Sequence, residues 1–108
     1  MSRRDYLTTK TELVEMVRAF PEDQRNRECV YFNEHRAIVN TECPVCIMGN
    51  FFCVIGLQDE GWINHEPLSA ADNYSILMKH FDDQSCNYLI GVQDMADTNR
   101  TWWEAVVD

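Results

Sequence analysis

The sequence predicts an α+β fold: one small globular domain over residues 1–108, with about four helices and a short antiparallel hairpin. Several segments repeat apolar residues at the helical period, and one segment has two β-rich runs around a polar tetrapeptide. A length of 108 residues with 45% hydrophobic residues suits a single buried core. Neither an internal repeat nor a Pro/Gly-rich linker divides the chain.

The first predicted helix lies in "TTKTELVEMVRAF". Its apolar residues follow the i, i+3, i+4, i+7 spacing of one helix face: Leu13, Met16, Val17 and Phe20. Thr9 and Glu12 have the spacing of a capping box, and Pro21 is expected to end the helix.

The hairpin is predicted in "RECVYFNEHRAIVN", where β-branched and aromatic residues lie on both sides of "NEHR". We expect its strands near residues 29–32 and 36–40. The next segment is ambiguous, because Gly49-Asn50 suits the turn of a second hairpin and Asn50 equally suits a helix N-cap. We favour a helix from Asn50 to a stop near Gly61, since apolar and polar residues then fall on opposite sides.

The second half of the chain predicts further helices. In "SAADNYSILMKHF" one helical face is apolar, with Ser69 or Asp72 as cap: Tyr74, Leu77, Met78 and Phe81. The segment "SCNYLIGVQDMAD" suits a short helix or a strand through 88–92. A Thr101/Glu104 capping box predicts a last helix in "TWWEAVVD".

The net charge of −9 is unevenly distributed along the chain. Residues 1–40 carry seven basic and seven acidic residues, whereas residues 41–108 carry two basic residues against eleven acidic ones. Such a field repels phosphate and disfavours nucleic-acid binding. The acidic residues therefore either serve solubility or form a face that docks on a basic partner.

The expected location is the cytoplasm, because the sequence shows neither a secretory signal nor an apolar run long enough to span a membrane. In that reducing compartment the five cysteines are expected as free thiols or metal ligands. Cys43 and Cys46 form a Cys-x-x-Cys pair that suits a structural zinc ion, with Cys53 as a third ligand. We favour packing in the core, without a cofactor, because bulky apolar residues flank both cysteines.

A catalytic alternative rests on His80, Asp82 and Asp83, whose imidazole and carboxylates fall within one turn. They suggest a small hydrolase or a ligand-binding enzyme. The competing interpretation is a solvated helix end, where His80 complements the helix dipole. We favour the latter, since no nucleophile–base spacing or phosphate-binding loop accompanies these residues.

The two adjacent tryptophans, Trp102 and Trp103, are the strongest candidates for a partner-binding site. Neighbouring helix positions point about 100° apart, so one ring is expected in the core and the other at the surface. Trp103 is the one expected in the core. The expected partner face combines these rings with acidic residues: Trp102, Trp103, Asp59, Glu60, Asp82 and Asp83.

Three stretches, "CVIGLQDEGW", "LSAADNYSILMKHF" and "YLIGVQDMADTNRTWWEAV", together resemble a pattern in small uncharacterised accessory proteins of actinobacterial bacteriophages and their hosts. The shared features are a Cys-x-x-Gly helix start, a leucine-bearing segment and a short C-terminal amphipathic helix. The resemblance covers about half the chain and supplies no catalytic residues. It implies a phage-encoded accessory protein, and the composition adds a function: binding a host protein through an acidic and aromatic surface, without catalysis.

Overall fold

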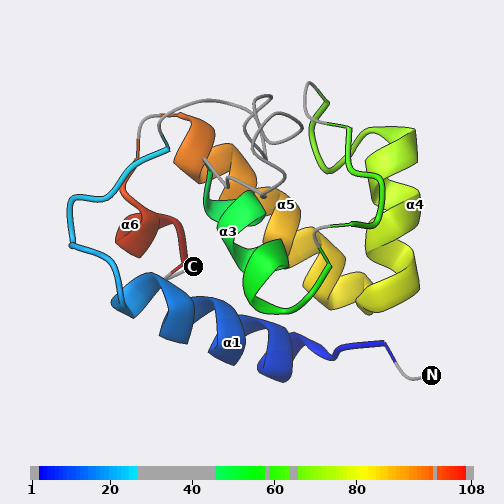
Figure 1. Cartoon of the computed structure of the whole chain (residues 1–108), viewed down its shortest axis with the longest axis horizontal. Coiled ribbons are helices and arrows are strands. Elements are labelled where there is room, and N and C mark those ends of the chain that lie inside the picture. The colour runs from blue at the N-terminus through cyan, green and yellow to red at the C-terminus, as the bar shows by residue number, and fades with distance from the viewer. Residues whose placement is uncertain (1–2, 27–45, 58, 64–65, 99, 107–108) are drawn as a thin grey trace.

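A computed structural model describes residues 3–26, 46–57, 59–63, 66–98 and 100–106 of the chain. Within these ranges the chain forms a bundle of helices (Figure 1). The helices are α1 (Tyr6–Arg18), α3 (Ile47–Val54), α4 (Ala71–His80), α5 (Asp83–Asp97) and α6 (Trp102–Val106).

The predicted α+β class is wrong, because 63% of the described residues are helical and they contain no sheet. Their only β feature is an isolated bridge between Arg4 and Phe81. The hairpin expected over 29–32 and 36–40 lies outside the described residues. Residues 88–92, for which a strand was the alternative, lie within the 15-residue helix α5. The buried positions of α5 recur at the helical period, which favours a helix over a strand.

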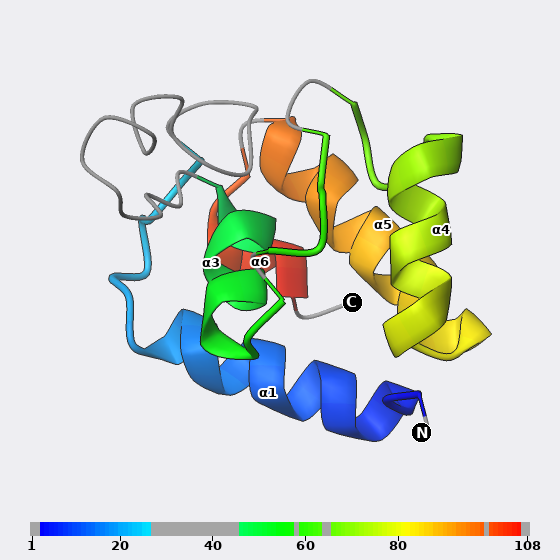
Figure 2. The same ribbon diagram turned by 45° about the vertical axis from the view of Figure 1, so that its right-hand side comes forward.

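Helix α5 forms the centre of the bundle and packs against each of the other four helices. In both views it lies between α4 on one side and α3 on the other (Figures 1 and 2). The largest core side chains are fully buried: Trp102, Phe51, Phe52, Phe81 and Leu13. The Phe52 ring stacks on that of Trp62, with ring centroids 4.0 Å apart. Aromatic burial of this kind dominates the stability of a small core.

Helix α1 presents the predicted apolar face to the core, since Leu13, Met16 and Val17 are buried. The predicted capping box is wrong. The helix begins at Tyr6, and the Asp5 carboxylate accepts from the Thr8 backbone N–H at 2.7 Å. The box does not form because the side chains of both of its predicted members, Thr9 and Glu12, bond to other partners. The Thr9 hydroxyl contacts Asp5 O and Ser85 Oγ, and the Glu12 carboxylate pairs with Arg4 at 3.0 Å.

Helix α3 confirms the preference for a helix over a second hairpin turn, but its predicted limits are wrong. Its N-cap is Cys46, whose Sγ accepts a hydrogen bond from Gly49 N at 3.3 Å, so Asn50 lies within the helix. The helix ends at Val54, seven residues before Gly61. Gly56, at φ 78°, provides the left-handed residue that reverses the chain just after the helix.

Helix α4 forms where it was predicted, but with a different start and a shifted face. Its N-cap is Ala70, without a side-chain hydrogen bond, so neither Ser69 nor Asp72 caps it. Met78 is 42% exposed, whereas Asn73 is fully buried. The apolar stripe alone did not predict this rotation, because a buried asparagine reads as polar in a sequence pattern.

Asn73 holds the irregular segment before α4 in place. Its side-chain oxygen accepts from Ile63 N at 2.9 Å, and its amide nitrogen donates to the carbonyls of Ile63, Glu66 and Pro67. One side chain therefore satisfies backbone groups that no helix or sheet pairs. The segment carries Trp62 to its stacking position on Phe52.

We expect Asn73→Ala to lower the free energy of unfolding by about 1–3 kcal/mol, because partly buried backbone groups lose their hydrogen bonds to the Asn73 side chain. Chemical denaturation followed by circular dichroism measures the loss. Ser75→Ala is the matched control, since Ser75 lies on the same helix, is exposed and donates its hydroxyl to Ala71 O within that helix. Equal, small losses in both variants would show that Asn73 does not hold the segment.

Candidate partner-binding groove

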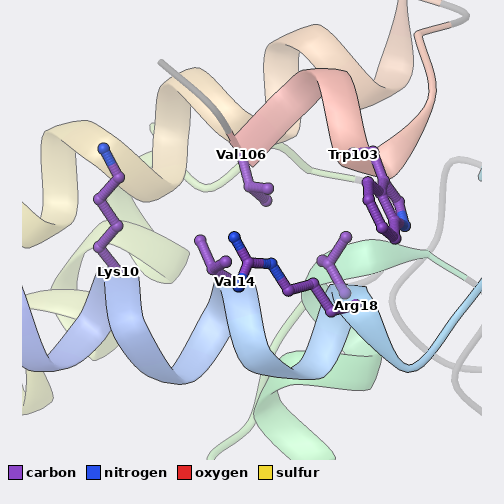
Figure 3. A pocket seen from close by; sticks show the side chains of 6 residues that line it. Lys10, Val14, Arg18, Trp103 and Val106 are labelled. Atoms are coloured by element: carbon purple, nitrogen blue, oxygen red, sulfur yellow. The ribbon is translucent and has the colours of Figure 1, made fainter. Parts of the chain in front are cut away.

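A groove of about 440 Å³ lies between α1 and α6 (Figure 3). Its walls are mainly apolar and two cations accompany them: Lys10, Val14, Val17, Arg18, Trp103 and Val106. Figure 3 shows Trp103 and Val106 pointing from α6 toward α1, and Val14 and Arg18 pointing from α1 toward α6. A concave surface with apolar walls and a few polar groups is typical of ligand-binding sites.

The helical period of α1 explains its side of the groove. Leu13, Met16 and Val17 face the core. Lys10, Val14 and Arg18, spaced by four residues, form the neighbouring stripe and line the groove. This stripe was not predicted from the sequence, although its four-residue spacing lies directly beside the core face.

The other wall depends on α6, which begins at the predicted Thr101/Glu104 capping box. The box is confirmed. Thr101 N donates to Glu104 Oε1 at 2.9 Å, and Glu104 N donates to Thr101 Oγ1 at 3.2 Å. Hydrogen bonds from Thr101 hold the pKa of Glu104 below its ordinary value. This reciprocal cap fixes the start of a helix that is too short to persist alone.

The prediction that Trp103 is the buried tryptophan is wrong. Trp102 is 2% exposed, packs edge-on against Phe20 at 4.8 Å between centroids, and donates from Nε1 to Asn26 Oδ1 at 2.8 Å. Ala105 and Val106 are buried on the same side of α6, and they decide which stripe faces the core. Trp103 is only partly buried, and its Nε1 donates to Phe20 O at 3.2 Å.

Lys10 is held at one end of the groove by aromatic side chains. Its Nζ lies 3.4 Å from the Tyr6 hydroxyl and 5.7 Å from the ring centroids of both Tyr6 and Tyr88. Tyr88 in turn donates its hydroxyl to Val106 O at 2.9 Å, and burial raises its pKa. The ammonium group is thus positioned by cation–π contacts beside the wall that α6 provides.

A second hollow of about 260 Å³ lies between α5 and α6 and shares Tyr88 with the surroundings of Lys10. Gly91 lines it, within α5. Apart from its two chain neighbours and the adjacent backbone of its own helix, a side-chain methyl group at Gly91 would meet no atom within 4 Å. The described structure therefore gives no steric reason for glycine in the middle of this helix.

We expect Gly91→Ala to raise the free energy of unfolding by about 0.5–1 kcal/mol, because alanine restricts the unfolded chain and favours the helix. Denaturant titration of the variant against the original protein measures the gain. A loss of stability would show that the space beside Gly91 is not open.

The acidic residues of the expected partner face do not lie with the tryptophans. Asp59 and Glu60 precede α4, while Asp82 and Asp83 begin α5. In both views the corner between α4 and α5 lies apart from α6 (Figures 1 and 2). The structure brings Trp103 together with cations of α1 instead.

The residues of the catalytic alternative each contact a different group. His80 Nε2 contacts the Glu60 carboxylate. Asp82 caps α5 by accepting from Ser85 N at 2.8 Å, and Asp83 is a largely exposed side chain 3.8 Å from Arg3. Hydrogen bonds from Ser85 hold the pKa of Asp82 below its ordinary value. The three side chains thus do not converge on one point.

Because the pKa of Asp82 is lower in the folded state, its charged form stabilises the fold above about pH 4, and this contribution is lost as the pH falls further. We expect Asp82→Ala to lower Tm at pH 7, with a difference that shrinks below pH 4. Asp83→Ala is the control, since Asp83 does not cap the helix. A Tm difference that is constant with pH would contradict the capping role of the carboxylate.

The three described cysteines differ in burial and in the helix position that they occupy. Cys46 is buried and caps α3, Cys53 is partly buried on α3, and Cys86 is buried on α5. Desolvation raises the pKa of Cys86, which donates to Phe81 O at 3.6 Å. Cys43 lies outside the described residues. Within the described ranges no three His, Cys, Asp or Glu side chains are grouped as for a metal ion, and zinc bound by Cys43, Cys46 and Cys53 stays a prediction.

None of the helices in the described part of the chain has the length and apolar character that crossing a bilayer requires. Comparisons of the chain with protein-family models, with curated proteins and with solved structures each gave no match. The resemblance to phage accessory proteins therefore stays a prediction.

Proposed function

We propose that this chain is a non-catalytic binding domain whose groove between α1 and α6 receives a segment of a partner protein that carries apolar and acidic residues. The observation that supports this most is the position of Trp103. Its ring lines an apolar groove while it remains partly exposed. Trp102, by contrast, is buried in the core and anchors α6 there.

The groove has the properties of a protein-binding hot spot. Tryptophan and arginine are the residues that contribute most often to binding energy at interfaces, and here they lie on facing walls. Val14 and Val106 add apolar surface on the walls that α1 and α6 provide. A partner side chain placed there would be removed from water on several sides, which is the condition under which such contacts bind strongly.

The cations of the groove favour an acidic partner segment. The chain has a net charge of −9, so a site that presents Lys10 and Arg18 differs in sign from the protein as a whole. Opposite charges at an interface speed association and fix its orientation. That the partner is a host protein, met in the host cytoplasm by a phage accessory protein, is supported by the sequence resemblance alone.

Site-specific photocrosslinking tests this proposal. A photoreactive amino acid replaces Val14 in the groove or, as the matched control, Val54, a valine that is 65% exposed on α3 and does not line the groove. Both proteins are irradiated in an actinobacterial extract. We expect a discrete adduct from position 14 only, which disappears in the Trp103→Ala background and maps to an acidic segment of the partner. Identical adducts from both positions, or adducts unaffected by Trp103→Ala, would contradict the proposal.

A further inference from the structure

We infer that the segment in the groove is an amphipathic helix lying along α1, with two acidic residues seven or eight positions apart that pair with Lys10 and Arg18. The inference rests on the proposed function and specifies the chemistry of the occupant. It follows from the arrangement of side chains along one stripe of α1.

The stripe extends beyond the groove toward the start of α1. Leu7 precedes Lys10 by three positions and Val14 by seven, so all three lie on the same side of the helix. Leu7 is 74% exposed, the most exposed large apolar residue of the described chain. From Leu7 to Arg18 the stripe is about 16 Å long, which is three turns of helix. An apolar residue at one end and a groove at the other suit a ligand that extends along the helix.

Lys10 and Arg18 are the two cations of this stripe, and they lie about two helical turns apart along α1. Eight residues separate Lys10 from Arg18, or about 12 Å along the axis. Neither is joined to a carboxylate by an ion pair in the described part of the chain. Tyr6 and Tyr88 position the Lys10 ammonium, and the Arg18 side chain runs along the groove in Figure 3. In Figure 3 the Arg18 guanidinium lies beside Val14, turned toward Lys10, and the Arg18 side chain is exposed. Two carboxylates at a similar interval along the helix would therefore pair with both cations once the Arg18 side chain extends away from Val14.

A helix is the ligand that matches this interval with apolar residues between the charges. Acidic residues at i and i+7 or i+8 are separated by about 10–12 Å on one helix face, and positions i+3 and i+4 lie between them on the same face. Those positions would reach Val14 and Trp103, both of which line the groove. Binding of an amphipathic helix in a groove between helices is a recurrent mode of peptide recognition.

Synthetic helical peptides test the inference by fluorescence anisotropy. The first peptide carries glutamates at i and i+7 with leucines at i+3 and i+4. The second has the same composition with both glutamates on the opposite face, and the third has glutamine in place of glutamate. We expect the first peptide to bind at least about tenfold more tightly than the other two, and salt to reduce this advantage.

Variants of the protein connect the preference to the two cations. Lys10→Gln and Arg18→Gln are expected to remove the advantage of the first peptide over the glutamine peptide, so that each variant binds both peptides equally. Lys79→Gln, on α4, is the matched control and is expected to change neither. Circular dichroism melts establish that each variant is folded.

The outcomes separate this inference from the proposed function. Equal affinities for all three peptides, all weakened by Trp103→Ala, would overturn the helical acidic spacing and leave the groove as the binding site. Binding that is insensitive to Trp103→Ala would overturn both. If none of the peptides binds up to about 1 mM, the inference is wrong, and the crosslinking from position 14 decides the proposed function independently.

Discussion

Replacing Trp102 by alanine is expected to lower the free energy of unfolding by about 3–5 kcal/mol, the usual cost of truncating a buried aromatic side chain. Trp102 is 2% exposed and lies against Phe20, and its indole N–H bonds to Asn26. The same Asn26 oxygen accepts from Ile47 N at 2.9 Å, so the loss of Trp102 also affects the start of α3. Denaturant titration monitored by circular dichroism measures the change.

Trp102→Phe is the matched control, because it keeps an aromatic ring against Phe20. It removes the additional ring area of the indole and its N–H. We expect a smaller loss than for alanine, since part of the buried area is retained. If the alanine variant is as stable as the original protein, Trp102 does not anchor α6 to the core.

Trp103→Ala is expected to weaken partner binding while changing stability little, the opposite of Trp102→Ala. Its side chain is only partly buried, so stability should change by less than about 1 kcal/mol beyond the loss of the bond to Phe20 O. The free energy of binding to the partner that crosslinks to position 14 should become less favourable by about 2–4 kcal/mol, as for an interface hot spot. Isothermal titration with the purified partner measures it. A parallel loss of stability and binding in both tryptophan variants would show that α6 is only part of the core.

The helices with a strong apolar period were predictable from the sequence. The core face of α1 and the capping box of α6 appear where their spacings indicated. Helix starts were less predictable, because several residues near each start are able to cap it. Asp5 rather than Thr9 caps α1, since the Thr9 hydroxyl contacts Ser85 on α5. That partner is 76 residues away and invisible to a local pattern.

The α+β prediction is wrong for the described residues, which are mostly helical, and the hairpin on which it rested, over 29–32 and 36–40, lies outside them. A short run of β-branched and aromatic residues has the same composition whether it forms a strand or the buried face of a helix. Residues 88–92, for which a strand was the alternative to a helix, are such a run, and Tyr88 and Val92 are buried by contacts of α5 with other helices. Buried polar side chains such as Asn73 and Gln93 also disguise the core faces of their helices.

The groove itself required the three-dimensional structure, because α1 and α6 lie at opposite ends of the described chain. The spacing of Lys10, Val14 and Arg18 was present in the sequence, but charged residues beside an apolar stripe usually mark a solvated helix face. The tryptophan pair was recognised, whereas its orientation was not. Valines follow both rings at i+4, so this spacing alone does not distinguish the two tryptophans, and in the structure Ala105 and Val106 are buried with Trp102.

The indole N–H signals of the three tryptophans provide the most direct test of the groove. In a ¹⁵N-labelled protein, Trp62 and Trp102 report on the core and Trp103 reports on the groove. Titration with the peptide that carries glutamates at i and i+7 is expected to shift the Trp103 signal and leave those of Trp62 and Trp102 in place. Saturation binding with an unchanged Trp103 signal would contradict binding in the groove between α1 and α6.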